Sequence, residues 1–164
     1  MFSTYYGCED LYRKVMSPSG WYYTGDIGSM DEYGFTYFSG RKANVLHFNR
    51  WGDKVYPAAI EAAAEKYPKV SQTQAVGFKE PGVVDCDTII LCVIPAKNQD
   101  ITEDELRAHC ERELLDHMWP DHYVVMETFP RVGIRQKVSK EELLKSAKSI
   151  LLDSGKLKLS EMNQ

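Results

Sequence analysis

The apolar and polar positions in the central and C-terminal parts of the chain change period several times, which predicts alternating helices and strands. Residues 87–95 are apolar and rich in β-branched side chains over the length of a strand. Leu106, Cys110 and Leu114 recur at helical spacing and fall on one face of a helix. The elements expected in chain order are a helix over 57–67, strands over 73–78 and 87–95, a helix over 102–118, a strand over 122–129 and a helix over 139–152.

The starts of the three expected helices carry recognisable signals. Pro57 opens an alanine-rich run, and proline is favoured at the first position of a helix. Thr102 and Glu105 have the spacing of a capping box, as do Ser139 and Glu142. These signals fix where each helix is expected to begin.

The first part of the chain has a different character. Its first forty residues are rich in Tyr, Gly and Ser and give little signal for a helix. Short β-type runs are separated by turn residues, which is typical of hairpins. The expected strands are 20–28 and 34–40, joined by a turn over 29–34, and then 44–48 and 53–56, joined by a turn over 49–52.

The order of elements predicts an α+β fold. We expect a small mixed sheet of about three strands covered by helices, preceded by a β-hairpin and a β-rich remnant of a larger N-terminal domain. The expected organisation is the end of that larger domain over 1–41, a small C-terminal lid domain over 42–152 and a flexible tail over 153–164.

Composition narrows the class of protein. The 164 residues are 43% hydrophobic and 27% charged, as in globular domains, and the net charge is −4. The lack of a basic excess argues against nucleic acid as a partner. The N-terminus lacks the pattern of a signal peptide, and no apolar run has the length of a membrane span. We therefore expect a cytoplasmic protein.

Cysteine and histidine give no sign of a metal site. The cysteines form no CxxC pair, so reduced thiols are the expected state. His117 and His122 are poorly spaced for a helical metal pair, so no metal ligands are assigned.

Three segments, residues 20–45, 52–61 and 101–144, resemble in that order three motifs of the AMP-forming acyl-CoA synthetases. These acyl- and aryl-CoA ligases belong to the adenylate-forming superfamily. The last segment has the family's order of a helix, a proline, a strand and a Pro-Arg pair before a lysine in a loop. The resemblance implies an acid–thiol ligase that adenylates a carboxylic acid with ATP and transfers the acyl group to coenzyme A.

The resemblance assigns Asp26 and Arg41 to nucleotide binding. A carboxylate accepts hydrogen bonds from the vicinal hydroxyls of a ribose, and Gly25 allows a sharp turn beside it. A guanidinium offers a planar fork of donors near ribose and phosphate. Without the family spacing, Asp26 reads as an ordinary turn residue and Arg41 as a surface residue at a strand end.

Lys137 matches the catalytic lysine of the family. An ammonium group on a long stem neutralises the repulsion between a carboxylate and the α-phosphate of ATP. The motif departs from the family at Gln136, where glycine is usual, and by one extra residue between Pro130 and Lys137. A solvated loop lysine is the alternative reading.

Two further pairs complete the site that the resemblance implies. Lys42 and Ala43 lie at the hinge, where the family usually has Asp or Lys at the second position. Trp51 and Gly52 lie in a lengthened turn that approaches coenzyme A in the family. Trp51 alternatively packs on its own hairpin.

The implied cofactors and partners are ATP, Mg2+, coenzyme A, a carboxylic acid and the protein's own N-terminal domain. The family's phosphate-binding loop and acyl pocket are not found in the sequence, so we expect a C-terminal fragment that is inactive alone. Two alternatives stay open. One is an adenylation enzyme without CoA transfer, and the other is a non-catalytic nucleotide-binding or regulatory relic of the fold.

Overall fold

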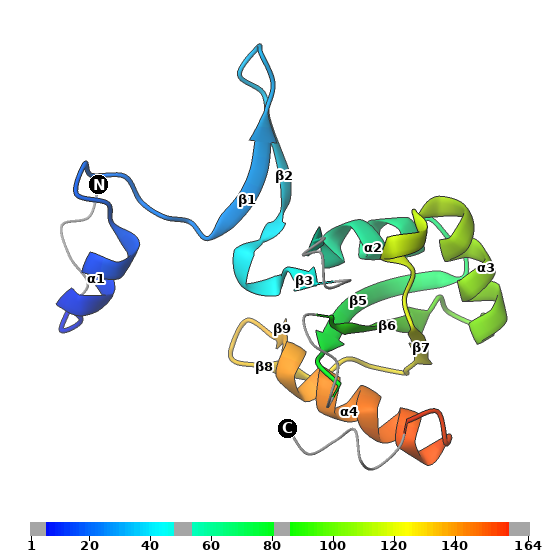
Figure 1. Ribbon diagram of the computed structural model, residues 1–164. Helices are drawn as coiled ribbons and strands as arrows, with labels where there is room; N and C mark the ends of the chain where they lie inside the picture. The colour runs from blue at the N-terminus through cyan, green and yellow to red at the C-terminus, as the bar shows by residue number, and fades with distance from the viewer. Residues whose placement is uncertain (1–5, 48–53, 81–85, 158–164) are drawn as a thin grey trace. The chain divides into compact units, whose positions relative to one another are not determined.

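The computed structural model describes residues 6–47, 54–80 and 86–157. The chain forms two compact units, residues 1–43 and residues 44–164 (Figure 1). A 3-10 turn, η1 (Lys42–Asn44), spans the boundary between them.

The first unit contains one antiparallel hairpin. Strand β1 (Asp26–Met30) pairs with β2 (Thr36–Arg41), and the register shifts at a bulge between Ile27 and Gly28. A short helix, α1 (Glu9–Val15), precedes the hairpin in a region where the sequence analysis expected none. Its acidic first turn and basic last turn complement the helix dipole, and this was the signal for it.

A single carboxylate organises the tip of this hairpin. Asp31 Oδ1 accepts hydrogen bonds from the backbone N–H groups of Tyr33 and Phe35, at 3.0 and 2.9 Å. The Tyr37 hydroxyl donates to Oδ2 at 2.9 Å. Desolvation acts to raise the pKa of Asp31, but the bonds from Tyr37 and the backbone outweigh it and lower that pKa. Between the bulge and the turn, the strands are therefore paired in a single register, from Gly28 opposite Phe38 to Met30 opposite Thr36.

The second unit is a three-stranded sheet with helices on both faces. Its strand order is β5-β6-β7, antiparallel between β5 and β6 and parallel between β6 and β7. The parallel pair requires a crossover, and α3 supplies it. The elements are β3 (Leu46–His47), β4 (Lys54–Val55), α2 (Pro57–Ala64), β5 (Val70–Phe78), β6 (Thr88–Pro95), α3 (Glu103–Glu113), η2 (Asp116–Met118), β7 (His122–Val125), β8 (Arg131–Val132), β9 (Lys137–Val138) and α4 (Lys140–Asp153).

Strand β6 lies at the centre of the core because its side chains are buried on both faces. Ile89, Leu91 and Val93 point into one apolar cluster, and Ile90 and Cys92 point into another. All five are fully buried. Burial of one such large aliphatic side chain contributes about 1.5–3 kcal/mol, so this strand dominates the stability of the sheet.

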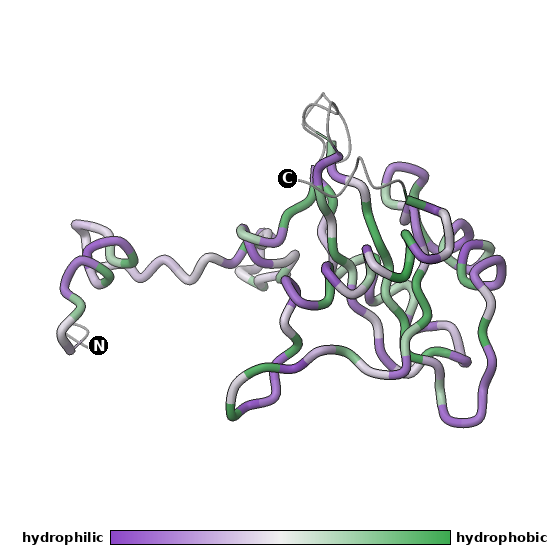
Figure 2. Tube along the Cα trace, turned by 90° about the horizontal axis from the view of Figure 1, so that it is seen from below, coloured by the Kyte–Doolittle hydropathy of each residue, from purple (hydrophilic) through white to green (hydrophobic). Residues whose placement is uncertain are grey.

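Different helices cover the two faces. Helices α2 and α3 lie over the first cluster, and α4 lies over the second (Figure 1). Figure 2 shows that hydrophobic positions are concentrated along the strands of this unit. Besides the β6 residues, the first cluster contains Leu46, Val55, Ile60, Ala64, Ala75, Ile101, Leu106, Cys110 and Tyr123, and the second contains Val76, Phe78, Val124, Phe129, Leu143, Ala147, Leu151 and Leu157.

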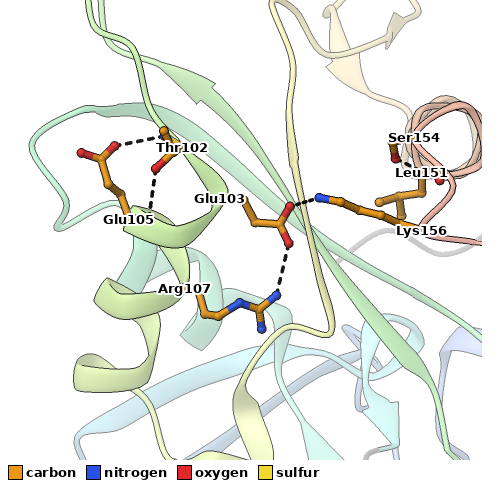
Figure 3. A network of polar contacts seen from close by, with 7 residues as sticks. All are labelled: Thr102, Glu103, Glu105, Arg107, Leu151, Ser154 and Lys156. Atoms are coloured by element: carbon orange, nitrogen blue, oxygen red, sulfur yellow. Dashed lines mark hydrogen bonds and ion pairs between the residues drawn. The ribbon is translucent and has the colours of Figure 1, made fainter.

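Polar contacts join the start of α3 to the end of α4 (Figure 3). Thr102 and Glu105 form the expected capping box at the start of α3. Gly155 has a φ of 71° and ends α4 in a Schellman-type turn, in which Lys156 N–H donates to the Leu151 carbonyl. This turn directs the Lys156 ammonium onto Glu103.

Glu103 therefore holds two cations, Lys156 and Arg107. Partial burial opposes ionisation of this carboxyl, but the hydrogen bonds and charges of Lys156 and Arg107 lower its pKa overall. The ion pair of Glu103 with Lys156 connects α3 with the turn that ends α4, and these two helices cover opposite faces of the sheet.

The structure confirms the α+β class and the three-stranded mixed sheet. Helix α2 ends at Ala64 rather than residue 67, because the next turn tightens: the N–H groups of Lys66 and Tyr67 donate to carbonyls three residues back. Helix α3 ends at Glu113, where Leu114 becomes extended, and a separate 3-10 turn follows. The expected strand over 122–129 ends at Val125. The β8–β9 hairpin was not expected, since strands of two residues show no period.

All four cysteines fall within the described residues and are thiols rather than disulfides. Burial raises the pKa of Cys92 to about 12 and that of Cys110 to about 11, which makes both poor nucleophiles. Within the described segments, no helix is both long and apolar enough to cross a bilayer.

Glu61 of α2 completes the edge of the sheet. Its carboxylate accepts a hydrogen bond from the buried backbone N–H of Ala75 in β5 at 2.9 Å. An edge strand leaves such groups without a strand partner, so a side chain has to satisfy them. This contact gives Glu61 a structural role.

We expect Glu61→Ala to lower the free energy of unfolding by about 1–3 kcal/mol, because it leaves the Ala75 N–H buried without an acceptor. Glu61→Gln keeps an acceptor oxygen and should retain most of the stability. The exposed Glu141→Ala is the matched control and should change little. Urea unfolding of the three variants measures the difference, and equal midpoints for Glu61→Ala and wild type would contradict it.

Candidate functional site

Asp26 and Arg41 face each other as a cross-strand pair in the β1–β2 hairpin. Arg41 Nε lies 2.8 Å from Asp26 Oδ1, and the two side chains are 58% and 35% exposed. Arg41 Nη1 also donates to the Thr24 carbonyl at 2.8 Å. Sequence reasoning named both residues but did not foresee that they bind each other.

This pairing leaves polar capacity on both side chains. A carboxylate has about four acceptor positions and a guanidinium has five N–H donors. Among the described residues, Asp26 Oδ2 and Arg41 Nη2 have no hydrogen-bond partner. Because the ion pair fixes both groups, the remaining acceptors and donors have a defined direction towards solvent.

The turn before β1 shapes the surface beside this pair. Gly25 has a φ of 75°, in the left-handed region that favours glycine. Its carbonyl accepts a hydrogen bond from Lys42 N–H at 2.8 Å, and the Asp26 N–H donates to Thr24 Oγ1 at 3.1 Å. An open concavity of about 600 Å3 is lined by Thr24, Gly25, Arg41, Lys42 and Ala43.

The predicted hinge pair lies directly after β2. Lys42 and Ala43 are exposed, and they form the start of the 3-10 turn at which the chain divides into its two units. Trp51 and Gly52, the residues predicted to lie near coenzyme A, fall outside the described residues.

Lys137 lies in the second unit, on the short β8–β9 hairpin. It pairs with Val132 across the hairpin, and Arg131 pairs with Val138. The Lys137 side chain is exposed, and among the described residues it has no hydrogen-bond or ion-pair partner. The hairpin leads directly into α4, whose N-cap is Ser139.

Lys140, the next lysine in the sequence after Lys137, has different surroundings. Lys140 lies 3.9 Å from Glu61 Oε1, so a carboxylate already faces it. Within the described segments no carboxylate faces Lys137, while Lys140 is part of the contact between α4 and α2. This difference favours Lys137 over Lys140 as the residue that meets an anionic ligand.

The first departure from the family motif is Gln136, which stands where glycine is usual, and the structure shows how the loop accommodates it. Its φ is 51°, so the position has the left-handed backbone that glycine adopts most readily. Glutamine is held there by two contacts to the Gly133 carbonyl, from its backbone N–H at 3.1 Å and from its side-chain amide at 3.3 Å. The substitution thus keeps the conformation of the loop.

Sequence reasoning missed the part that Arg131 plays in this hairpin. Its guanidinium donates to the Gln136 carbonyl and to the side chain of Gln72 in β5. Pro130 and Arg131 form the Pro-Arg pair of the motif, but no spacing rule connects Arg131 with Gln72.

Among the described residues, no group of three or more His, Cys, Asp or Glu side chains is arranged to hold a metal ion. The fixed charges that remain at the two candidate positions are the Asp26–Arg41 pair and the Lys137 ammonium. Both suit anionic or hydroxyl-bearing organic ligands.

Residues 59–135 match the family model described as "AMP-binding enzyme C-terminal domain". Among curated proteins, the chain is similar to the mitochondrial medium-chain acyl-CoA ligase ACSF2 of Rattus norvegicus, with 31% identity over 139 residues, which are 85% of this chain and 22% of that protein. It is also similar to the sulfoacetate–CoA ligase of Cupriavidus necator, with 32% identity over 143 residues, 87% of this chain and 27% of that protein. The chain thus spans about a quarter of the length of these relatives.

Solved structures share the fold. The ATP-bound MatB of Rhodopseudomonas palustris superposes with a TM-score of 0.76 at 22% identity, over 92% of this chain and 29% of that one. The Bacillus subtilis O-succinylbenzoate coenzyme A synthetase, in complex with ATP and magnesium, gives a TM-score of 0.75 at 22% identity, over 88% and 28%. The family match, the relatives and the shared fold agree: residues 59–135 of this chain form an AMP-binding enzyme C-terminal domain.

Proposed function

We propose that this chain is the C-terminal part of an ATP-dependent acid–CoA ligase, in which Lys137 acts in the adenylation step. The observation that carries the proposal is the exposed ammonium of Lys137, which has no partner among the described residues, on a hairpin that leads into α4. The resemblance of residues 101–144 to the family's closing segment assigns the catalytic lysine to this position. The similarity to ligases named for medium-chain acids and sulfoacetate supports the reaction class.

The chemistry requires a cation at the point where two anions meet. The carboxylate of the acid attacks the α-phosphorus of ATP, the bond to pyrophosphate breaks, and negative charge builds on the phosphoryl oxygens. An ammonium that contacts both reactants lowers the energy of this transition state. Lys137 has a mobile stem and no competing carboxylate among the described residues, so it is available for this contact.

Asp26 and Arg41 suit the nucleotide. Asp26 Oδ2 has room to accept from the two ribose hydroxyls, while its Oδ1 is held by Arg41 at 2.8 Å. The Arg41 donors that the ion pair leaves over can meet a hydroxyl or phosphate oxygen. Mg2+ takes oxygen ligands and is commonly bound through the phosphates of the nucleotide, so it needs no protein cage in this chain.

The second half-reaction passes the acyl group from the adenylate to the thiol of coenzyme A. We propose that the second unit turns about Lys42 and Ala43 between the two steps, and that the lengthened turn with Trp51 and Gly52 then meets coenzyme A. The division of the chain after Ala43 supports this hinge. The small side chain of Ala43 suits a hinge, which needs freedom in φ and ψ rather than charge.

The protein's own N-terminal domain is the partner we propose for the first unit. Its hairpin exposes large apolar side chains at 57–80% of their area, far more than a small isolated sheet normally leaves in water. A larger domain that packs on the hairpin would bury them. The exposed residues are Met30, Tyr33, Phe35, Tyr37 and Phe38.

The compartment stays a prediction. The relatives include a ligase named as mitochondrial and ligases from bacteria, so we propose the cytoplasm only as the simplest location for an enzyme that uses ATP and coenzyme A.

Replacing Lys137 by Ala in the complete ligase should reduce ATP–pyrophosphate exchange by about 100-fold or more, because one electrostatic contact to the transition state is lost. Octanoate, sulfoacetate and 2-succinylbenzoate serve as acid probes. Thioester formation from supplied acyl-adenylate should survive. Lys140→Ala is the matched control and should retain exchange; unchanged exchange in Lys137→Ala would remove Lys137 from this role.

Replacing Asp26 by Asn should raise the KM for ATP by about tenfold, because an amide is a weaker acceptor for hydroxyls and no longer holds Arg41. Glu32→Gln, an exposed change in the same hairpin, is the control. The test compares ATP and 2′,3′-dideoxy-ATP. If Asp26 meets the ribose, the analogue should lose affinity in the wild type and much less in Asp26→Asn, and an equal loss in both would exclude the ribose contact.

A further inference from the structure

The backbone that carries Lys137 is fixed by contacts on both sides of the hairpin. Val132 pairs with Lys137 in the ladder, and the Ser139 N–H donates to the Pro130 carbonyl at 2.9 Å. Val138, next to Lys137, packs against the second apolar cluster. These contacts fix the exit strand but leave the residue before Lys137 in a loop.

That residue is Gln136, whose left-handed conformation is unfavourable for a side chain other than glycine. Its two contacts to the Gly133 carbonyl hold the loop side of Gln136. Without support at its carbonyl as well, the peptide between Gln136 and Lys137 would relax towards a commoner backbone conformation. Such a change would rotate the start of the Lys137 side chain. The carbonyl of Gln136 is therefore the point at which a brace has the greatest effect on the ammonium.

Arg131 supplies a contact at this point. Its Nη1 donates to the Gln136 carbonyl at 3.1 Å, and its Nη2 donates to Gln72 Oε1 at 2.9 Å. Gln72 lies in β5, within the sheet. A planar guanidinium has the geometry to connect two acceptors at once, whereas a lysine ammonium is a single point of charge.

We propose that Arg131 and Gln72 are positioning residues for Lys137, which connect the peptide before the catalytic lysine to the rigid sheet. The proposal rests on the function proposed above for Lys137. Arg131 itself does not touch the reactants; it transmits the position of β5 to the loop. Errors of about 1 Å in the position of a reacting group reduce rates by up to about 100-fold, so a brace of this kind affects the chemical step.

The same hairpin contains a matched control. Arg135 is an exposed arginine in the same loop and, within the described part of the chain, has no hydrogen-bond or ion-pair partner. Arg131→Met and Arg135→Met remove the same charge from neighbouring positions. A general loss of positive charge affects both variants, whereas a loss of the brace affects only the first.

The kinetic test uses the complete ligase with octanoate, ATP and coenzyme A, or with whichever of the three acid probes gives exchange in the wild type. We expect Arg131→Met to lower kcat of ATP–pyrophosphate exchange by about 10- to 100-fold with the KM for ATP nearly unchanged. Thioester formation from supplied acyl-adenylate should stay normal. Arg135→Met should leave kcat within about threefold of the wild-type value.

Three further variants separate the brace from folding. Gln72→Met removes the acceptor on β5 at an exposed position and should reproduce the loss of kcat. Gln72→Glu keeps an acceptor and should retain kcat. Arg131→Lys should fall between Arg131→Met and the wild type, since an ammonium reaches one acceptor less effectively than a fork reaches two.

Amide hydrogen exchange on the 164-residue chain gives a readout that does not depend on activity. Peptides covering 131–139 should shift to faster exchange in Arg131→Met and Gln72→Met but not in Arg135→Met. Unchanged exchange in both would overturn the brace. Faster hydrogen exchange with normal kcat, in a ligase that Lys137→Ala inactivates, would overturn its part in catalysis. An active Lys137→Ala ligase would instead overturn the proposed function itself.

Discussion

The structure of the second unit depends on the burial of β6 on both of its faces. A strand that carries Ile and Leu on one face and Ile and Cys on the other is stable only when helices cover both. Helices α2 and α3 satisfy one face and α4 the other. The position of α4 follows from this requirement, and the β8–β9 hairpin must therefore end where α4 begins.

This packing determines the position of Lys137, the candidate catalytic lysine. Val138 and Phe129 belong to the second apolar cluster, so both ends of the hairpin are held by the core while its tip stays in water. Arg131, on the same hairpin, adds a hydrogen bond to Gln72 of β5. An exposed side chain is thus carried on a hairpin that contacts the apolar core and the sheet, and such support is what a catalytic group on a loop requires.

The sequence predicts many of these elements, and the physical reason differs from one element to the next. The long apolar run of β6, the capping box of Thr102 and Glu105, and Pro57 at the start of α2 are local signals, and the structure has all three. The contact of Arg131 with Gln72 joins residues 59 positions apart and depends on how β5 and the hairpin come together. No local pattern encodes such a contact. The ion pair of Asp26 and Arg41 was missed for the same reason, since it follows from the register of a hairpin with a bulge.

The exposure of Lys137 to solvent also determines how strongly its charge can act on an anion. Two unit charges 4 Å apart interact with about 1 kcal/mol in bulk water but with about 4 kcal/mol at the lower effective dielectric near a protein surface. An ammonium in water therefore does little for the repulsion between a carboxylate and a phosphate. Its effect grows when a second protein surface closes over the nucleotide and excludes water. Under the function proposed for Lys137, a lysine carried on a unit that turns about Lys42 and Ala43 becomes effective only once such a surface has closed, which would set the moment at which its charge acts.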